Sequence, residues 1–295
     1  MSEFKNVGTI NYNASMKDYT SFKIGGPADI LIEPSSIEEL KNAIVQAKEF
    51  DLPYMILGNG SNVLVSDKGI RGVVIRLGDK FSEIEVNDCE ITAMAGAKVS
   101  TVSKTALKHS LTGMEEISGI PGSVGGGVMM NAGAYGGEFK DIVKEVLAMD
   151  RDLNLISLNN EELNFRYRGS KISDDNLIVL KVVFELEKGD YEKIQNLMRE
   201  VTEKRNTKQP LTLPSAGSVF KRPKGHYAAK LIEDANLKGL RHKGAQVSEK
   251  HSGFIVNIDN ATAQDVMDLI GVVRKTVYDK FGVNLEREIR IIGEI

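Results

Sequence analysis

The chain has 295 residues, 41% hydrophobic and 27% charged, which is the composition of a globular protein large enough for about two domains. Its formal net charge of −3 argues against nonspecific nucleic-acid binding as the main function, because that binding needs a large basic face. No run approaches the roughly 20 apolar residues of a membrane span, the N-terminus has no apolar signal segment, and the single cysteine, Cys89, permits no intramolecular disulfide. We therefore expect a cytoplasmic protein with no membrane insertion.

The first two thirds of the chain predict a mixture of helices and strands. Ser36 and Glu39 have the spacing of a capping box, which marks the start of a helix. Strand-like runs flank this helix, and the second run leads directly into residues 58–65, so a ligand loop is expected at its end. The expected helices are 37–50, 99–111 and 191–206, and the expected strands are 28–34, 53–58, 72–77, 83–87, 89–95, 144–150, 153–158 and 177–187.

Pro210 and Pro214 indicate a linker. We place the domain boundary there, which gives a first domain at 1–208, itself divided near 75, and a second domain at 209–295. The C-terminal part predicts helices at 228–236 and 263–281 and strands at 254–258 and 285–293, with Thr262 as the cap of the long helix. The fold class is α+β or α/β, in two parts.

Eight of the 28 glycines lie within the 21 residues 118–138. Glycine loses more conformational entropy on folding than any other residue, so this cluster indicates backbone held at positive φ or pressed against another molecule. A flexible surface loop is the alternative, but flexible linkers lack apolar residues such as Ile120, Val124 and Val128. The segment is therefore predicted to line a bound cofactor with peptide N–H groups.

Residues 58–62, Gly-Asn-Gly-Ser-Asn, are a second cofactor candidate. Glycine and asparagine adopt left-handed conformations readily, and consecutive N–H groups can then surround a diphosphate. The Rossmann fingerprint G-x-G-x-x-G would need glycine at Val63, so a Rossmann fold is disfavoured. A plain β-turn remains the alternative for this loop taken alone.

No metal site is expected, because none of the four histidines has the spacing of a metal-binding motif. Between Lys221 and Lys250, eight Lys and Arg residues stand against three acids, a net charge of +5 that suits either a small anionic ligand or a solvated face. Arg168, Ser218 and Glu288 remain as candidates for chemistry, although the alternation of the last strand taken alone favours a solvated Glu288.

Taken together, these segments resemble the bacterial UDP-N-acetylenolpyruvoylglucosamine reductases, the MurB family of peptidoglycan precursor synthesis. The similarity extends over nearly the whole chain. The segments that carry it, in the family's order, are SFKIGGPA (21–28), LGNGSNVLVSD (57–67), SGIPGSVGGGVMMNAGAYGGE (118–138), FRYRGS (165–170), AGSVFKRP (216–223) and LEREIRIIG (285–293). The resemblance implies an α+β chain with an FAD-binding fold of the vanillyl-alcohol-oxidase/PCMH type, followed by an α+β substrate-binding domain whose last strand returns toward the FAD domain.

The resemblance also implies an activity, the FAD-mediated reduction by NADPH of an enolpyruvyl ether of a UDP-sugar to a lactyl ether. Ser218 would donate the proton, while Arg168 and Glu288 would polarise the carboxylate and stabilise the enolate-like intermediate. The expected substrate contacts are Arg168, Lys221, Tyr227, Lys230 and Gln246. The expected contacts to noncovalent FAD are Gly58, Asn59, Gly60, Ser61, Asn62, Gly119, Pro121, Gly122, Ser123, Gly125, Gly126, Asn131 and Gly133.

The chain departs from the commonest family pattern at three places. Gly127 stands where alanine is frequent and Met129 where an aromatic is common, so the packing beside the flavin is expected to differ. The stretch between Leu186 and Thr212 is too short for the tyrosine-bearing loop insertion of one branch, so the chain resembles the branch without it. Another FAD oxidoreductase of the same fold, or a flavin- or nucleotide-binding module without turnover, is the alternative, and a monomer is favoured.

Overall fold

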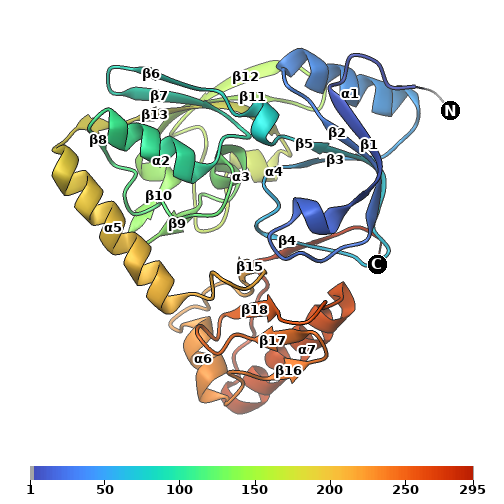
Figure 1. The fold of residues 1–295 in the computed structure, drawn as a ribbon, viewed down its shortest axis with the longest axis vertical. Helices are drawn as coiled ribbons and strands as arrows, with labels where there is room; N and C mark the ends of the chain where they lie inside the picture. The colour runs from blue at the N-terminus through green and yellow to red at the C-terminus, as the bar shows by residue number, and fades with distance from the viewer. Residues whose placement is uncertain (1–2, 295) are drawn as a thin grey trace. The chain divides into compact units, whose positions relative to one another are not determined.

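In a computed structural model, which describes residues 3–294, the helices and strands belong to two units (Figure 1). Unit 1 contains residues 3–10, Ile32–Asn59 and Val74–Lys204, and unit 2 contains Asn11–Leu31, Gly60–Val73 and 205–294. The chain passes from unit 1 to unit 2 inside the 58–62 loop. Unit 2 thus includes the predicted second domain, four residues that precede it, and two segments from the first 75 residues.

A five-stranded sheet in the order β12-β11-β13-β7-β6 belongs to unit 1, with all neighbours antiparallel (Figure 1). Helix α3 contacts both β7 and β13, and helix α2 contacts β7. The alternation of β13 directs Leu180, Val182 and Phe184 into the core, where all three are fully buried. The bounds are β6 (Ile84–Asn87), β7 (Glu90–Met94), α2 (Val99–Lys108), α3 (Val124–Met129), β11 (Val143–Met149), β12 (Leu155–Asn159) and β13 (Ile178–Glu185).

A second sheet has the order β1-β2-β5-β3, so that β5 lies between the two strands that flank helix α1. The predicted capping box of α1 is half correct. Ser36 caps the helix by accepting a hydrogen bond from Glu39 N at 3.1 Å, but the Glu39 carboxylate accepts from Ser35 N at 2.6 Å and from the Ser35 hydroxyl at 2.8 Å. The bounds are β1 (Thr9–Ser15), β2 (Pro27–Glu33), α1 (Ile37–Glu49), β3 (Tyr54–Leu57) and β5 (Ile70–Arg76).

The remaining elements before the predicted linker are short, apart from helix α5. This helix and β14 occupy most of the stretch between Leu186 and Thr212, where the sequence leaves no room for a loop insertion. The bounds are η1 (Met16–Tyr19), β4 (Val63–Val65), η2 (Asp79–Phe81), β8 (Leu111–Thr112), β9 (Gly133–Ala134), β10 (Gly137–Glu138), η3 (Phe139–Asp141), α4 (Lys171–Asp174), β14 (Glu187–Lys188) and α5 (Tyr191–Lys208).

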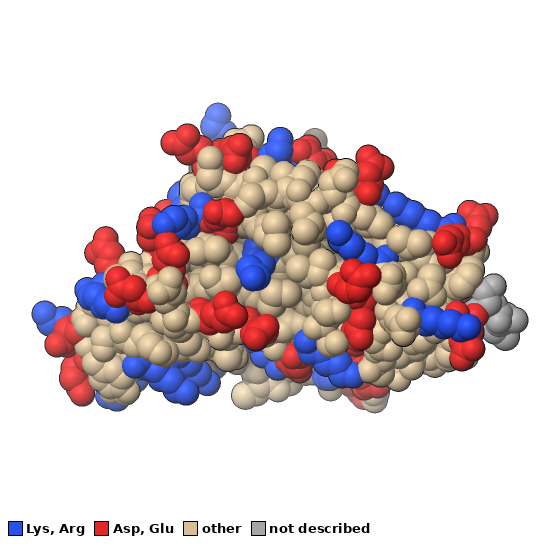
Figure 2. Space-filling model, turned by 90° about the horizontal axis from the view of Figure 1, so that it is seen from above, with Lys and Arg blue, Asp and Glu red and all other residues tan. Residues whose placement is uncertain are grey.

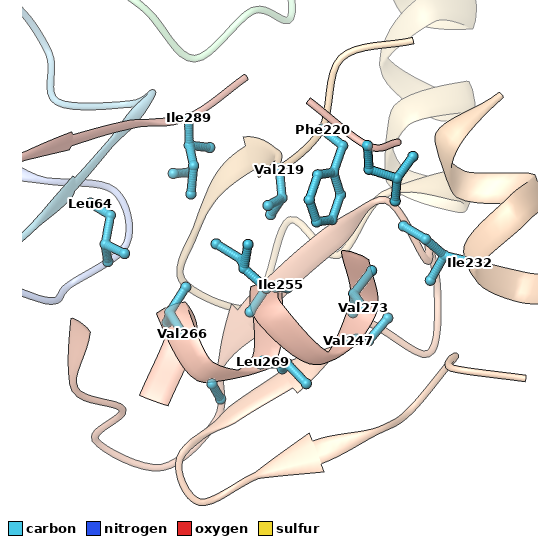
Figure 3. Packing of buried hydrophobic residues seen from close by; sticks show 14 of the residues in the cluster. Leu64, Val219, Phe220, Ile232, Val247, Ile255, Val266, Leu269, Val273 and Ile289 are labelled. Atoms are coloured by element: carbon cyan, nitrogen blue, oxygen red, sulfur yellow. The ribbon is translucent and has the colours of Figure 1, made fainter. Parts of the chain in front are cut away.

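Unit 2 has a four-stranded sheet in the order β15-β18-β17-β16. The long helix α7 begins at the predicted cap, where Thr262 and Asp265 form a capping box, and ends at Gly282 in a left-handed conformation. Its apolar residues recur at helical spacing, and Val266, Leu269 and Val273 enter the core of unit 2 (Figure 3). The bounds are β15 (Ser215–Ser218), α6 (Ala228–Asp234), β16 (Arg241–His242), β17 (Ala245–Val247), β18 (Phe254–Asn257), α7 (Ala263–Phe281) and β19 (Arg290–Ile292).

The last strand is shorter than the sequence predicts. Only β19 forms regular strand, and it pairs in parallel with β4, so Arg290 lies opposite Val63. Before it, residues 285–289 make a single bridge from Arg287 to Phe220. Leu64 and Ile289 share a core with Val219, which explains why an N-terminal segment belongs to unit 2 (Figure 3).

Charged side chains of both signs are interspersed on the face drawn in Figure 2, without a large field of one sign. This arrangement fits the small net charge and gives that face no footprint for a phosphate backbone. Among residues 3–294, no helix has the length and apolar character that spanning a membrane requires.

Candidate active site

The glycine-rich segment folds onto the end of strand β7. Val99 N donates to Gly122 O at 3.0 Å, Val124 N to Ala97 O at 2.8 Å, and Gly125 N to Ala95 O at 2.8 Å. A Cβ at Gly125 would lie 3.0 Å from the Ala95 Cβ, which is a tight contact that glycine avoids. The middle of the segment forms helix α3, which the sequence analysis did not predict.

Among the eight glycines of this segment, Gly127 and Gly133 leave no room for a Cβ. Among them only Gly136 has a positive φ, of 107°. At Gly127 a Cβ would lie 2.2 Å from the Phe139 Cζ, which is far inside van der Waals contact. The sequence predicted backbone at positive φ or pressed against another molecule, and the structure adds close contacts with the chain itself.

The two predicted cofactor segments meet within unit 1. Asn59 Nδ2 donates to Pro121 O at 3.4 Å, and a Cβ at Gly58 would lie 2.4 Å from the Ser123 Oγ. The Ser123 side chain therefore occupies the space that a side chain at position 58 would need. Two glycine-rich turns packed side by side suit a diphosphate, which is bound by peptide N–H groups rather than by long side chains. The residues present thus fit the FAD that the sequence predicts.

Asn131 and Gly133 follow α3 and belong to a tightly bonded turn. Asn131 is buried at a φ of 40°, and its amide donates to Glu138 Oε2 at 2.8 Å and to Arg166 O at 3.3 Å. Its side-chain oxygen accepts from Lys140 N at 3.0 Å. The side chain of Asn131 therefore holds the turn in place, with Gly133 in the short β9–β10 hairpin beyond it.

Arg168 lies at the tip of a four-residue turn between Arg166 and Gly169, which exchange backbone hydrogen bonds of 3.0 and 3.2 Å. It has a φ of 56°, and its guanidinium lies 5.2 Å from the centre of the Tyr167 ring. Ser170 fastens the turn to α3 by donating to Met129 O at 3.1 Å. The structure thus places Arg168 beside the glycine-rich segment.

The positive charge of Arg168 contributes to the pKa of Glu138, which lies on strand β10. The Lys140 ammonium, bonded to Glu138 at 2.9 Å, lowers the pKa of this carboxyl, and Asn131 and the more distant Arg168 lower that pKa further. Glu138 therefore remains ionised near Arg168.

Unit 2 brings Ser218 and Glu288 together. Ser218 ends β15, and the next carbonyl, Val219 O, accepts a hydrogen bond from Glu288 N at 2.8 Å. Lys221 N donates to Glu286 O at 2.8 Å, so the two segments run antiparallel beside each other. Both Ser218 and Glu288 are partly exposed. Two residues 70 positions apart, both chosen as chemical candidates, thus lie on adjacent segments.

The second half of the 58–62 loop contacts the same region. Asn62 Nδ2 donates to Glu288 O at 3.4 Å, and Asn62 O accepts from Arg290 N at 3.0 Å. Gly60 has a φ of 61°, and a Cβ there would lie 2.1 Å from Tyr19 O, so no other residue fits. The second half of the predicted cofactor loop therefore lies, within unit 2, against the segment that carries Glu288.

Of the predicted substrate contacts, Arg168 lies in unit 1 and the other four lie in unit 2. Lys221, Arg222 and Lys224 line a cavity of about 430 Å³, together with Glu286, which pairs with Lys221 at 2.6 Å. The exposed Tyr227 has the Arg222 guanidinium 3.9 Å above its ring. The other predicted contacts have different local partners, Lys230 with Asp234 on α6 and Gln246 Nε2 with Gly239 O at 3.1 Å.

The described residues contain no cluster of three or more His, Cys, Asp or Glu that could hold a metal ion.

Sequence reasoning missed Ser21, which contacts both the 58–62 loop and β15. The signal was available, because Ser21 begins the SFKIGGPA segment.

Comparison with known proteins places two family models on the chain. One, described as an FAD binding domain, matches residues 28–159, and the other, the UDP-N-acetylenolpyruvoylglucosamine reductase C-terminal domain, matches 209–292. The chain is 52% identical over 285 residues to the UDP-N-acetylenolpyruvoylglucosamine reductase of Clostridioides difficile (strain 630), covering 97% of this chain and 94% of the relative.

Two solved structures are similar as well. The UDP-N-acetylenolpyruvylglucosamine reductase from Thermus caldophilus has 37% identity and a TM-score of 0.81, covering 96% of this chain and 98% of the other. The 6-hydroxy-D-nicotine oxidase from Arthrobacter nicotinovorans has 14% identity and a TM-score of 0.50, covering 98% of this chain and 63% of the other. At that identity the second similarity concerns the fold alone.

Proposed function

The chain belongs to the UDP-N-acetylenolpyruvoylglucosamine reductase family, and we propose that it reduces the enolpyruvyl ether of a UDP-N-acetylglucosamine derivative to the lactyl ether, UDP-N-acetylmuramate. The reductant is NADPH and the cofactor is FAD. The chain is thus an oxidoreductase of peptidoglycan precursor synthesis, which acts on a carbon–carbon double bond. We infer a cytoplasmic, monomeric enzyme whose partner is a nucleotide sugar, with FAD bound mainly by the first domain and substrate by the second.

The observation that carries the proposed mechanism is the position of Ser218 next to the segment that holds Glu288. Bound FAD would supply the hydride chemistry that connects NADPH to the terminal alkene carbon of the substrate. The Ser218 hydroxyl donates a proton to the adjacent carbon. Glu288, on the neighbouring segment 285–289, orients the reacting group of the substrate and stabilises the charge that develops beside the substrate carboxylate.

Arg168 has the geometry to bind that carboxylate, because a guanidinium offers two parallel N–H donors. The turn between Arg166 and Gly169 holds Arg168 beside the glycine-rich segment. The Asn131 amide stabilises this turn by donating a hydrogen bond to Arg166 O. The 58–62 loop and residues 119–133 would hold the FAD diphosphate through peptide N–H groups.

A coupled assay tests this function directly. Purified protein should oxidise NADPH only when the enolpyruvyl nucleotide sugar is present, and the product should be the lactyl ether. A flavoprotein that oxidises NADPH with another acceptor but not with this substrate would be a different oxidoreductase of the same fold. A protein without a flavin spectrum would be a binding module of another kind.

We predict that the FAD is noncovalent, because neither the 58–62 loop nor residues 119–137 contain a histidine or cysteine that could form a flavin linkage. Acid precipitation should leave the yellow colour in the supernatant. Colour that stays with the precipitated polypeptide would contradict this prediction.

A further prediction concerns the basic segment of unit 2. If Lys221 or Lys230 binds the substrate diphosphate, its replacement by alanine removes a charge-assisted contact of ~1.5 to 3 kcal/mol and weakens nucleotide-sugar binding roughly ten- to a hundredfold. FAD content should not change. The binding constant of the nucleotide sugar, measured by calorimetry, checks this.

Lys275→Ala is the matched control, because Lys275 forms the same kind of i,i+4 pair with Asp279 on α7 as Lys230 forms with Asp234 on α6. Its affinity for the nucleotide sugar should equal that of the wild type. Unchanged affinity in both Lys221→Ala and Lys230→Ala would assign these lysines to the solvated surface.

A further inference from the structure

The SFKIGGPA segment has no role in the mechanism described so far. Its Phe22 and Ile24 are buried in the core of unit 2, and the Asn257 amide donates to Phe22 O at 3.3 Å. The segment is therefore firmly fixed, and whatever Ser21 contacts is fixed along with it.

Ser21 donates two hydrogen bonds, one to the cofactor loop and one to strand β15. Its peptide N–H donates to Gly60 O at 3.1 Å, and its hydroxyl donates to Ser215 O at 2.7 Å. Gly60 belongs to the predicted cofactor loop, and Ser215 begins β15, the strand that ends at Ser218. One residue thus connects the loop to the strand that carries the proposed proton donor.

Strand β15 needs this support because its pairing is irregular. Ser215 lies opposite Val256 and Ser218 opposite Phe254, so two steps along β18 correspond to three along β15. Gly217, inside this bulge, has a φ of 76° and nothing within 4 Å of a would-be Cβ. A bulge redirects a side chain, and its geometry depends on how firmly the strand is held at each end.

The same loop contacts the other catalytic segment through Asn62, whose amide donates to Glu288 O at 3.4 Å. The Gly60–Asn62 part of the loop is therefore linked to both segments that carry the catalytic candidates, directly to the Glu288 segment and through Ser21 to β15. Of these two connections, the Ser21 hydroxyl is the shorter and can be removed without altering the loop itself.

We propose that Ser21 is a positioning residue, which holds the start of β15 to the cofactor loop so that Ser218 is aimed at the substrate carbon that takes the proton. This inference rests on the proposed function. Since misplacement of a reacting group by about 1 Å can cost ~10²-fold in rate, loss of the Ser21 hydroxyl should affect proton delivery and leave hydride transfer to the flavin untouched.

The test compares Ser21→Ala with Ser21→Thr in the FAD-loaded enzyme. For Ser21→Ala we expect reoxidation of the reduced flavin by the enolpyruvyl nucleotide sugar to slow by ~10- to 100-fold, with a larger solvent deuterium isotope effect. Flavin reduction by NADPH should keep its wild-type rate. Ser21→Thr retains a hydroxyl and should restore the reoxidation rate.

A second readout is independent of activity. Amide hydrogen exchange at residues 215–219 should be faster in Ser21→Ala and normal in Ser21→Thr, because the hydroxyl bond restrains the bulge. Ser103→Ala, which removes a buried hydroxyl bond of 2.9 Å to Val99 O within α2, is the matched control and should change neither readout.

Equal slowing of both half-reactions in Ser21→Ala, or unchanged exchange at 215–219, would overturn the positioning role. A wild-type enzyme that the nucleotide sugar fails to reoxidise would overturn the proposed function instead. In that case the exchange measurement still decides whether Ser21 restrains β15.

Discussion

Replacing Ser218 with alanine should separate the two halves of the reaction. The hydroxyl is needed where the substrate takes its proton, and it has no part in the transfer of hydride from NADPH to the flavin. Loss of a positioned proton donor should slow reoxidation of the flavin by the substrate ~10²- to 10⁴-fold, while flavin reduction stays within a small factor of the wild-type rate. Stopped-flow absorbance, following bleaching by NADPH and recolouring by substrate, measures both rates.

Ser215→Ala is the matched control, because it removes a hydroxyl from the other end of the same strand while retaining the Ser215 carbonyl that Ser21 contacts. It should leave both rates near those of the wild type. If Ser218 were only a turn residue after the linker, Ser218→Ala would behave like this control, or would slow both phases through misfolding. Either result would remove Ser218 from the role of proton donor.

Variants of Glu288 and Arg168 should also slow reoxidation of the flavin while leaving its reduction unchanged. Glu288→Gln should slow the reoxidation phase, since the carboxyl stabilises the intermediate, and Arg168→Lys should do likewise, because an ammonium cannot reproduce a bidentate guanidinium contact. Neither change should affect bleaching by NADPH.

The parts of the site that depend on local chemistry could be predicted from the sequence. The glycine cluster at 118–138 and the 58–62 loop stood out by composition, and the structure packs them together at Gly58 and Ser123. The cap of the long helix at Thr262 was likewise predicted, and the structure adds Asp265 as the second residue of a capping box. Such features depend on residues that are close together in the sequence.

The parts that depend on long-range pairing could not be predicted in this way. Alternation along 285–293 suggested one continuous strand, whereas regular pairing starts only at Arg290, where β4 provides a partner. The same alternation favoured a solvated Glu288, and nothing local indicated that its backbone would pair beside Ser218. The length of the last strand and the role of Glu288 depend on which other segment pairs beside them. The periodicity of the sequence does not specify that segment.

Gly127 stands where alanine is frequent in the family, and the structure gives a steric reason for glycine here. The space of a Cβ at this position is filled by the Phe139 ring, 2.2 Å away. The ring is fully buried and packs edge-on against Phe184, with centroids 5.8 Å apart, so it has little freedom to move aside.

We therefore expect Gly127→Ala to lower the free energy of unfolding by about 1 to 3 kcal/mol, the usual cost of overpacking a core. The opposing gain in helix propensity is at most about 1 kcal/mol, so the steric effect decides the sign. Gly271→Ala in α7 is the matched control, because a Cβ there meets nothing within 4 Å, and this variant should gain stability from propensity alone. Denaturant unfolding of each variant measures these changes.

The double variant Gly127→Ala/Phe139→Leu separates a steric cause from any other. Leucine removes the ring atoms that approach the new methyl group, so adding Gly127→Ala should cost much less in the Phe139→Leu background than in the wild type. The non-additivity, measured as the coupling free energy of the cycle, should be at least about 1 kcal/mol in favour of the pair. Equal costs in the two backgrounds would mean that the Phe139 ring does not exclude a side chain at 127, and alanine would then be tolerated here as it is elsewhere in the family.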